Sequence, residues 1–334
     1  MSQRDDLVSV VVIGRNEGDR LRRCLASVVA MNKNGFDTEI IYVDSGSTDN
    51  SLEIANDFGA QVIALQPERP TAALGRNAGW LAAQGATVLF LDGDTILDAN
   101  FVAQSLPDLW RENHAVVWGH RREIHPEESL YNRVLDLDWI YAPGLTQFCG
   151  GDALMRYAAL AEVDGYDETL IAGEEPDMCR RMVGRGYTIL HVDRPMTGHD
   201  LAMTSWSQYW KRATRAGHAY AEISQRMAEV GQTFWADEVE RNRKRAVTLM
   251  GAAVWAVLAT IFFRSWWPLL ATVLFYALLV LRSAYKARWK SHDMLTLLLY
   301  GVHSHLQQIP IYFGQRSYQR LRKKGQKAAL VEYK

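Results

Sequence analysis

The chain contains little cysteine and almost no net charge, and both shortages exclude whole classes of protein. Its 3 cysteines in 334 residues are scattered and odd in number, without metal-binding spacing, which excludes a disulfide scaffold and fits a reducing cytosol. A formal net charge of −1 leaves no overall footprint for nucleic acid. Internal repeats, low-complexity tracts, a Walker loop and a GxGxxG motif are also missing. The start MSQRDD, with the short apolar run after it, is too short and too acidic for a signal peptide.

The most informative stretch that is present lies at residues 87–95, where an apolar segment ends in two carboxylates. Val88–Leu91 is apolar, and Asp92 and Asp94 follow with only Gly93 between them. Because alternate side chains of a strand point to the same side, we expect both carboxylates to face one point. Such a pair suits Mg²⁺ or Mn²⁺ bound together with a diphosphate. A turn or a helix cap is the alternative interpretation.

Strand and helix patterns alternate before this stretch, which predicts a mainly parallel sheet flanked by helices. Buried strand patterns and helical spacing follow one another at residues 8–13, 19–30, 39–43, 50–58, 61–65 and 74–84. In such a sheet, ligands bind beyond the carboxyl ends of the strands. Glu17, Asp44, Asp92 and Asp94 all fall at such ends, so the sequence predicts one site there.

In these features the chain resembles an inverting family 2 glycosyltransferase with the GT-A fold, an α/β nucleotide-diphospho-sugar transferase fold. The resemblance covers about residues 8 to 215 and rests on the order and spacing of VVVIGRNEG (10–18), VDSGSTDNS (43–51), GRNAG (75–79), LDGDT (91–95), GGDALMR (150–156) and GEEPDMCRR (173–181). It implies a nucleotide-sugar donor and a divalent cation as cofactor.

The resemblance also implies how the nucleotide part of the donor is bound. Glu17 and Asp44 would hold the base and the ribose, since carboxylates accept hydrogen bonds from imide N–H and hydroxyl groups. Arg76 would pair with the diphosphate or frame the base, with a helix surface charge as the alternative. Asp92 would contact the ribose or a metal-bound water.

The resemblance also implies which residues bind the metal and which lie near the donor sugar. Asp94, with Asp92 beside it, would bind Mg²⁺ or Mn²⁺, which offsets charge on the leaving nucleoside diphosphate. His199 is a candidate third metal ligand, with a purely structural histidine as the alternative. Gly151 and Asp152 would lie under the donor sugar, in a turn that leads into a helix. A plain helix N-cap fits Asp152 equally well.

A catalytic base is expected in the segment GEEPD at 173–177. Members of this family usually have Glu-Asp-x-Asp there, and the second position removes the acceptor proton. Here that position is Glu175, one methylene longer, while Glu174 and Asp177 are candidates to share the task. Asp177 can instead be a first-turn acid stabilised by a helix dipole. A base is needed for a hydroxyl acceptor and not for a phosphate, so it favours a hydroxyl.

Aromatic and basic residues follow the base and are candidates for contacts with the acceptor or a diphosphate. They are Trp206, Gln208, Trp210 and Arg212. The segment loosely resembles the Gln-x-x-Arg-Trp element of processive members, but the order differs, so we do not expect processive polymerisation. Trp206 and Trp210 stand four residues apart and can instead be core residues on one helix face.

The composition changes after about residue 230. Ala246–Phe263 and Trp266–Leu281 are almost wholly apolar and have basic clusters at the outer end of each. At 1.5 Å per residue they span roughly 27 and 24 Å, slightly short of a bilayer core of ~30 Å. They predict a hairpin of two spans with its tip at Arg264. A buried pair of helices in a soluble protein and a shallow re-entrant hairpin are the alternatives.

The region Met294–Phe313 has a single apolar stripe and precedes a strongly basic segment. A third span would place those basic residues outside, so we expect a helix in the cytoplasmic interface, ended or kinked by Pro310. The sequence does not decide between spanning and interfacial placement. The predicted organisation is a catalytic domain at 1–230, a basic linker at 231–245, a transmembrane hairpin at 246–281 and an interfacial helix with a basic tail at 282–334.

Together these features predict a membrane-anchored inverting glycosyltransferase at the cytoplasmic face of the inner membrane. It would transfer a sugar from a nucleotide-diphosphate sugar, with a UDP-sugar favoured, to a hydroxyl of a lipid-linked or cell-surface glycan precursor. Two alternatives remain: an enzyme that loads sugar directly onto a polyprenyl phosphate, and a non-catalytic membrane adaptor that binds nucleotide-sugar. The expected partners are the donor, the glycan acceptor and membrane lipid, and no nucleic acid.

Overall fold

The computed structural model describes residues 3–326, which divide into two compact units. The first, called here the sheet unit, comprises residues up to 125 together with 139–201. The second, the helical unit, comprises residues 126–138 and those from 202 onward. Each is described by itself.

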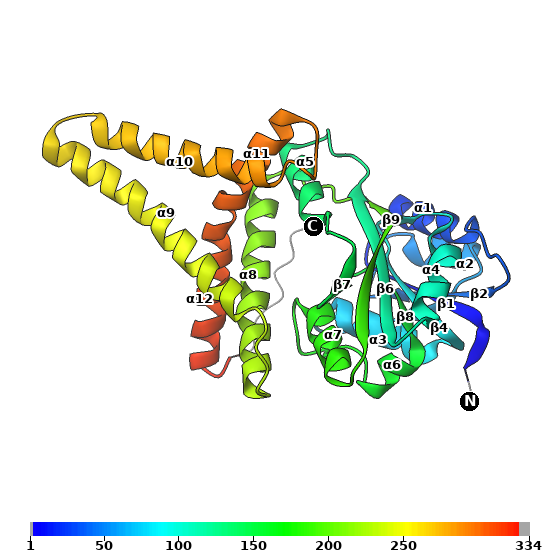
Figure 1. The fold of residues 1–334 in the computed structure, drawn as a ribbon. Coiled ribbons are helices and arrows are strands. Elements are labelled where there is room, and N and C mark those ends of the chain that lie inside the picture. The colour runs from blue at the N-terminus through cyan, green and yellow to red at the C-terminus, as the bar shows by residue number, and fades with distance from the viewer. Residues whose placement is uncertain (1–2, 327–334) are drawn as a thin grey trace. The chain divides into compact units, whose positions relative to one another are not determined.

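The sheet unit is built on one mixed sheet with the strand order β3-β2-β1-β4-β8-β6-β9-β5, and β7 pairs with β9 (Figure 1). β1, β2, β3 and β4 pair in parallel, β8 is antiparallel to β4 and β6, and β6 is parallel to β9. The parallel half confirms the pairing expected for residues 8 to 94. The strands are β1 (Arg4–Gly14), β2 (Asp37–Asp44), β3 (Gln61–Ala64), β4 (Gly85–Asp92), β5 (Thr95–Leu97), β6 (His114–Glu123), β7 (Gly144–Thr146), β8 (Ala153–Arg156) and β9 (Thr188–His199).

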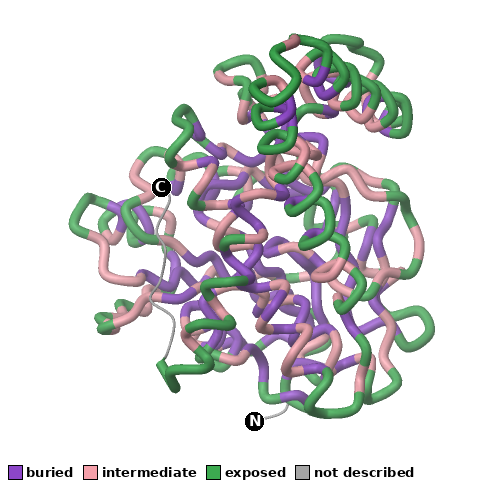
Figure 2. The backbone as a smooth tube through the Cα atoms, turned by 90° about the vertical axis from the view of Figure 1, so that its left-hand side faces the viewer, coloured by how far each residue is buried: buried purple, intermediate pink, exposed green. Residues whose placement is uncertain are grey.

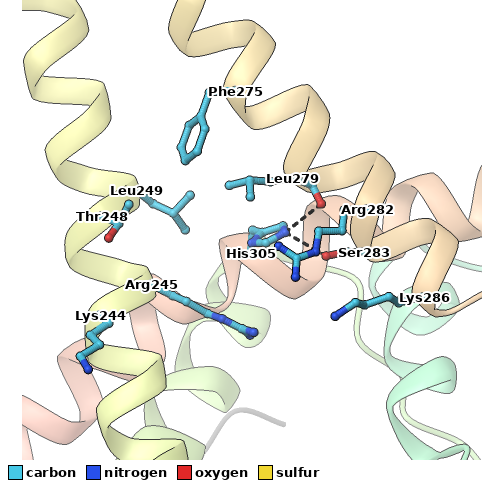
Figure 3. Close-up of a pocket in the computed structure, with 10 residues that line it drawn as sticks. All are labelled: Lys244, Arg245, Thr248, Leu249, Phe275, Leu279, Arg282, Ser283, Lys286 and His305. Carbon is cyan, nitrogen blue, oxygen red and sulfur yellow. Dashed lines mark hydrogen bonds between the residues drawn. The ribbon is translucent and has the colours of Figure 1, made fainter.

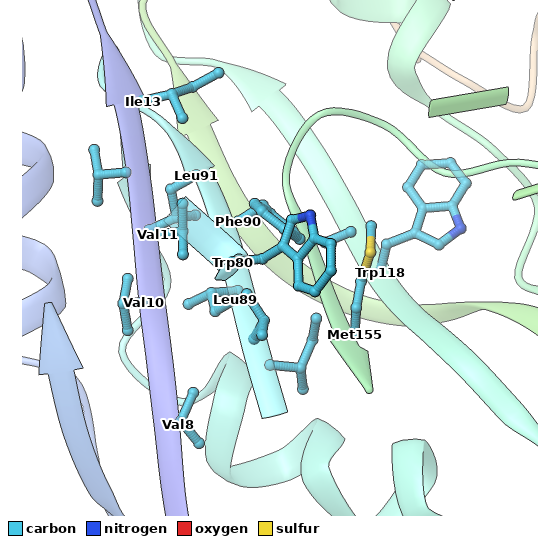
Figure 4. Close-up of a cluster of buried hydrophobic side chains, with 14 of the residues drawn as sticks. Val8, Val10, Val11, Ile13, Trp80, Leu89, Phe90, Leu91, Trp118 and Met155 are labelled. Atoms are coloured by element: carbon cyan, nitrogen blue, oxygen red, sulfur yellow. The ribbon is translucent and has the colours of Figure 1, made fainter. Parts of the chain in front are cut away.

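Helices flank this sheet because each has one apolar face. In α1, for example, Leu21, Leu25 and Val28 are buried at helical spacing. The core between helices and sheet contains the central residues of β1 and β4, among them Val10, Val11 and Leu89, all fully buried (Figure 4). The helices of the sheet unit are α1 (Asp19–Val29), α2 (Ser51–Asp57), α3 (Ala72–Ala82), α4 (Phe101–Trp110), α6 (Tyr157–Glu162) and α7 (Glu174–Gly184).

Two local expectations differ from the structure. The strand β4 ends at Asp92, and Gly93 and Asp94 form a turn, so the alternation of strand side chains does not extend to Asp94. The segment after Gly151 and Asp152 is the strand β8 and not a helix, because Leu89 and Phe90 of β4 pair with it in the sheet.

The helical unit contains two parallel helices, α8 and α12, in unusually close contact. A Cβ atom on Gly217 of α8 would overlap the carbonyl of Ile311 in α12, and one on Gly314 would overlap the carbonyl of Thr214. Only glycine permits this approach of the two backbones. The helices of this unit are α5 (Leu130–Asp136), α8 (Trp206–Glu229), α9 (Ala236–Phe263), α10 (Trp267–Lys286), α11 (Met294–Leu306) and α12 (Gln308–Lys323), and η1 (Leu137–Trp139) follows α5.

Helices α9 and α10 form the predicted hairpin, with Arg264 in a left-handed conformation at its turn. In the described part of the chain, these are the 2 helices long and apolar enough to cross a membrane by length and composition. Most of their large apolar residues are exposed, and Figure 2 colours each residue along the backbone by how far it is buried. Residues 236–245, expected to be a linker, are helical and form the first turns of α9.

The region expected to be one interfacial helix, Met294–Phe313, is divided between α11 and α12. α11 ends at Leu306, and Pro310 lies in the first turn of α12, where a missing backbone N–H costs nothing. In α11, His303 and Tyr300 hydrogen-bond the carboxylate of Asp138 at 2.9 and 3.0 Å. Helix α8, which we expected to end the catalytic domain at residue 230, belongs to the helical unit.

Candidate active site

The acidic residues at the strand ends lie side by side at one edge of the sheet. Asp44 ends β2 and Asp92 ends β4, and the register places them beside Gly14 and Ile13 at the end of β1. Glu17 lies in the loop after β1, close to Gly93, whose added Cβ would be 3.2 Å from the Cγ atom of Glu17. The edge where parallel strands end is the expected ligand-binding edge of such a sheet.

A buried arginine joins this edge to the segment expected to contain the base. The guanidinium of Arg76 donates to Asp92 Oδ1 at 2.9 Å and to Glu174 Oε1 at 3.2 Å, and it lies 3.0 Å from Glu175 Oε1. Its side chain is only 3% exposed, so it is not the helix surface charge offered as the alternative. Arg76 therefore holds three carboxylates from two distant parts of the sequence around one point.

Gly151 lies in the middle of this cluster. A Cβ atom at this position would be 2.5 Å from Arg76 Nη2, 3.0 Å from Asp92 Oδ2 and 3.4 Å from Glu175 Oε1. The absence of a side chain at this position thus lets the guanidinium of Arg76 and the carboxylate of Asp92 pack directly against the backbone of the loop.

The environment of Glu175 raises its pKa from 4.5 to about 7. Burial is the main cause, the neighbouring carboxylate of Glu174 adds to it, and the charge of Arg76 opposes it. A carboxylate with a pKa near the operating pH is suited to general base catalysis. Asp177 differs, because its carboxylate accepts from Arg181 at 2.9 Å within α7, and Arg181 in turn contacts the carbonyls of Val163 and Gly165.

The carboxylate of Asp44 orders its own loop. It accepts hydrogen bonds from the hydroxyl of Tyr42 at 3.0 Å, the N–H of Gly46 at 3.0 Å and the N–H of Ser47 at 2.7 Å, and Ser47 Oγ also donates to it. Glu17 pairs with Arg20 at 2.9 Å. A ribose hydroxyl bound to Asp44 would therefore have to share or replace a bond from Ser47.

Asp94 and His199 lie together, although they are far apart in the sequence. β5 and β9 are antiparallel neighbours with Thr95 opposite His199, which places Nε2 of His199 3.4 Å from Oδ2 of Asp94. The ring of Trp139 packs edge-on against the imidazole with 4.9 Å between centroids. Burial, and then the charge of Arg121, lower the pKa of His199, which favours the neutral, metal-binding form of its ring.

This pair fits a divalent cation that is shared with a ligand. A carboxylate oxygen and a neutral imidazole nitrogen are both ligands that Mg²⁺ or Mn²⁺ would accept, and these ions commonly take one or two protein ligands plus substrate phosphates. Among residues 3–326 there is no group of three or more His, Cys, Asp or Glu side chains arranged as a complete metal cage. The donor set therefore suits a metal that arrives with a diphosphate.

The structure adds one residue to the site, Arg121, that the sequence did not suggest, and it shows contacts of Asp152 that differ from a helix cap. Arg121, near the end of β6, donates to Asp92 Oδ2 at 3.3 Å and lies over the ring of Trp139. Asp152 accepts from the backbone N–H of Asp92 at 3.0 Å and from the hydroxyl of Thr197 at 2.7 Å. Asp152 is therefore not a helix cap, and it fixes the end of β4. The run His120-Arg121-Arg122 after a buried strand was the available signal for Arg121.

The candidate acceptor residues all lie in the helical unit. Gln208 accepts from the backbone N–H of Ser205 at 3.0 Å in a capping box, so its side chain closes the start of α8. Trp206 and Trp210 contact one another with 5.5 Å between ring centroids, and Trp206 is exposed. Their roles, with that of Arg212, remain predictions.

The amino-terminal part of the chain is similar to a known family of proteins. Residues 9–161 match the family model "Glycosyl transferase family 2". Probable glycosyltransferase YdaM of Bacillus subtilis (strain 168) is 23% identical over 263 residues, which are 72% of this chain and 60% of that protein. Glycosyltransferase AglE of Haloferax volcanii is 33% identical over 91 residues, which are 26% of this chain and 30% of that protein.

A solved structure confirms the fold over nearly the whole chain. The mannosyltransferase PcManGT from Pyrobaculum calidifontis, in complex with GDP-Man and Mn²⁺, superposes with a TM-score of 0.65 at 16% identity. The match covers 91% of this chain and 87% of that one. Residues 9–161 thus match a glycosyl transferase family 2 domain, the chain is similar in fold to a GT-A structure, and it spans less than two thirds of the length of YdaM and AglE.

Proposed function

We propose that this chain is a membrane-anchored, inverting glycosyltransferase that uses a nucleotide-diphosphate sugar, with a UDP-sugar favoured. The acceptor is a hydroxyl of a lipid-linked or cell-surface glycan precursor. One observation supports this most strongly. Glu175, with a pKa of about 7, lies 3.4 Å from the point where a side chain of Gly151 would begin.

In the proposed reaction, Glu175 accepts the proton of the acceptor hydroxyl as its oxygen attacks the anomeric carbon of the donor sugar. The new glycosidic bond forms on one face of the sugar while the bond to the nucleoside diphosphate breaks on the other, so the configuration inverts. The electron pair of the broken bond leaves with the diphosphate. Gly151 is proposed to lie under the donor sugar, and Arg76 fixes Glu175 and Asp92 relative to one another.

Asp94 and His199 would hold Mg²⁺ or Mn²⁺, with the diphosphate as the remaining ligand. When bound, the ion supplies Lewis-acid stabilisation of the charge that develops on the diphosphate. Because Asp92 is already held by Arg76 and Arg121, we assign it to the ribose or to a metal-bound water. The Mn²⁺ in the complex of PcManGT supports a divalent cation here.

Glu17 and Asp44 remain the proposed contacts of the base and ribose. Both lie at the edge where β1, β2 and β4 end, next to Asp92. Asp177, paired with Arg181, is the weakest of the three candidate bases. Glu174 shares Arg76 with Glu175, so we propose that it tunes the base and does not replace it.

The hairpin of α9 and α10 is proposed to anchor the enzyme in the inner membrane, with the sheet unit in the cytoplasm. The exposed apolar side chains of both helices support anchoring. An anchored enzyme meets an acceptor that is itself confined to a membrane.

Release of nucleotide from a panel of UDP-, GDP- and dTDP-sugars tests the proposal. Detergent-purified full-length chain is assayed with Mn²⁺, Mg²⁺ or EDTA, with and without a membrane lipid extract. Metal-dependent release from one donor is expected, and identifies the sugar. Donor binding without release under every condition would instead support the non-catalytic adaptor. Transfer onto added polyprenyl phosphate that survives loss of Glu175 would support direct loading of that lipid.

A further inference from the structure

A cavity of about 280 Å³ lies between α9, α10 and α11 within the helical unit (Figure 3). Its lining residues all belong to the helical unit, whereas the carboxylate cluster belongs to the sheet unit, and the transferase chemistry gives the cavity no role. The cavity is lined by Lys244, Arg245, Thr248, Leu249, Phe275, Leu279, Arg282, Ser283, Lys286 and His305.

Four of the lining residues are basic: Lys244, Arg245, Arg282 and Lys286. Among the described residues that line the cavity, none is acidic. A negative charge does lie outside the lining: the carboxylate of Glu240, one turn earlier in α9, is 3.4 Å from the ammonium group of Lys244. Like charges gathered around a cavity repel one another, and an anion bound between them offsets that cost.

The cavity also has a polarity gradient along the hairpin. α9 runs toward the hairpin tip and α10 returns from it, so Leu249 and Phe275 lie nearer the tip than Arg245 and Arg282 do. Leu279 continues the apolar wall beside Phe275 and Leu249 in Figure 3. The ligand that matches this order has an anionic head at the base of the hairpin and a hydrocarbon chain that extends toward its tip.

The polar wall of the cavity is fixed in place by α11. Nε2 of His305 donates to the carbonyl of Leu279 at 3.1 Å and lies 2.9 Å from Oγ of Ser283. These bonds connect α11 to α10 across the cavity and keep the hydroxyl of Ser283 next to Arg282. A hydroxyl among cations is a common setting for phosphate oxygens.

We propose that this cavity binds the phosphate headgroup of one membrane lipid, with its hydrocarbon chain along Leu249, Phe275 and Leu279. Basic pockets between membrane helices bind such headgroups in general. The inference rests on the hairpin lying in a membrane and not on the sugar-transfer reaction. Its test therefore measures binding, and failure of the transferase assay would leave it standing.

The experiment measures lipid retention by native mass spectrometry and affinity in nanodiscs. The full chain is offered phosphatidylglycerol or phosphatidylcholine, with inorganic phosphate as a competitor. We expect one phosphatidylglycerol per chain, and about 30-fold weaker binding in Arg245→Gln/Arg282→Gln, since each basic side chain near anionic lipid contributes about fivefold. Arg245→Lys/Arg282→Lys keeps both charges, and is expected to bind nearly normally.

Arg320→Gln/Lys323→Gln is the matched control, because it removes two positive charges from α12 at exposed positions outside the cavity. We expect unchanged retention in this variant. Equal losses in both double variants would overturn the proposal in favour of diffuse attraction to an anionic surface. Displacement of the lipid by millimolar inorganic phosphate would also overturn the proposal, because the cavity would then be a site for free anions. Equal retention of phosphatidylcholine would overturn it as well, because the cavity would then be a nonspecific apolar groove.

Discussion

At the scale of single residues, the candidate site depends most on Arg76. Its planar fork contacts Asp92, Glu174 and Glu175 at once, a geometry that the compact ammonium of lysine does not reproduce. Without this cation, Glu174 and Glu175 would lose their ion pairs with Arg76, whereas Asp92 would keep its contact with Arg121. An uncompensated buried charge typically costs about 3–5 kcal/mol.

Arg76→Lys should lower the rate of sugar transfer about tenfold or more. It should also shift the acidic limb of the pH–rate profile to higher pH. Glu175 acts as a base only when deprotonated, so the wild-type rate should fall as the pH decreases through about 7. The charge of Arg76 lowers the pKa of Glu175, so a weaker contact raises that pKa further. The pH profile of transfer measures this, with Arg111→Lys at an exposed position as the control. An unchanged pH profile of sugar transfer would show that Arg76 does not influence the catalytic base.

Asp94→Asn should abolish metal-dependent nucleotide binding and reduce transfer at least about 100-fold, while the thermal unfolding temperature changes little. The carboxylate is the charged member of the pair with His199, and an amide is a far weaker ligand for a hard cation. Isothermal titration calorimetry, in which Mn²⁺ is titrated into a mixture of protein and nucleotide, measures this binding. Undiminished Mn²⁺-dependent binding in the variant would exclude Asp94 as a ligand.

At the scale of elements, the contact between α8 and α12 organises the helical unit. Two glycines, Gly217 and Gly314, allow each helix to approach the carbonyls of the other. Neither was evident from the sequence, because a glycine inside a helical pattern is recognised as a packing position only when its neighbour is known. The capping box Ser205–Gln208 at the start of α8 could have been predicted from the sequence. The interpretation of Gln208 as an acceptor contact did not take this capping role into account.

Gly217→Ala should destabilise the chain by about 1–3 kcal/mol, because its methyl group would overlap the carbonyl of Ile311. Gly251→Ala in α9 is the matched control. No atom lies within 4 Å of an added Cβ there, so that variant should be neutral or slightly stabilised. Thermal unfolding in detergent compares the two. Equal unfolding temperatures for both variants would show that the helices do not require this close approach.

At the scale of the whole molecule, the parts predicted well are those governed by local pattern. The strands ending at Asp44 and Asp92, the helices between them and the apolar hairpin all follow from periodicity. The pairing of Asp94 with His199, and of Arg76 with Glu174 and Glu175, depends on strands and helices that meet only after folding. Arg121 was missed for the same reason. The limit of the catalytic domain was placed at residue 230 because amphipathic α8 shows no change in composition.

Replacing exposed apolar residues of the hairpin should release the chain from membranes. Leu258→Ser/Phe262→Ser/Leu270→Ser removes three large exposed side chains near the tip, and each buried aliphatic or aromatic side chain contributes about 1.5–3 kcal/mol to burial. Fractionation of cell membranes measures the shift. Val29→Ser/Leu81→Ser, at exposed positions of the sheet unit, should leave the distribution unchanged. A triple variant that still sediments with membranes would contradict anchoring by the hairpin.

The most direct test of the central claim compares Glu175→Gln with wild type for donor affinity and for the rate of sugar transfer. Removing a general base typically costs about 100- to 10,000-fold in rate. We predict a loss of that size in kcat with an unchanged Kd for the donor, whereas Glu162→Gln, on α6, should behave as wild type. A Glu175→Gln variant that transfers sugar to a hydroxyl acceptor at the wild-type rate would contradict the account.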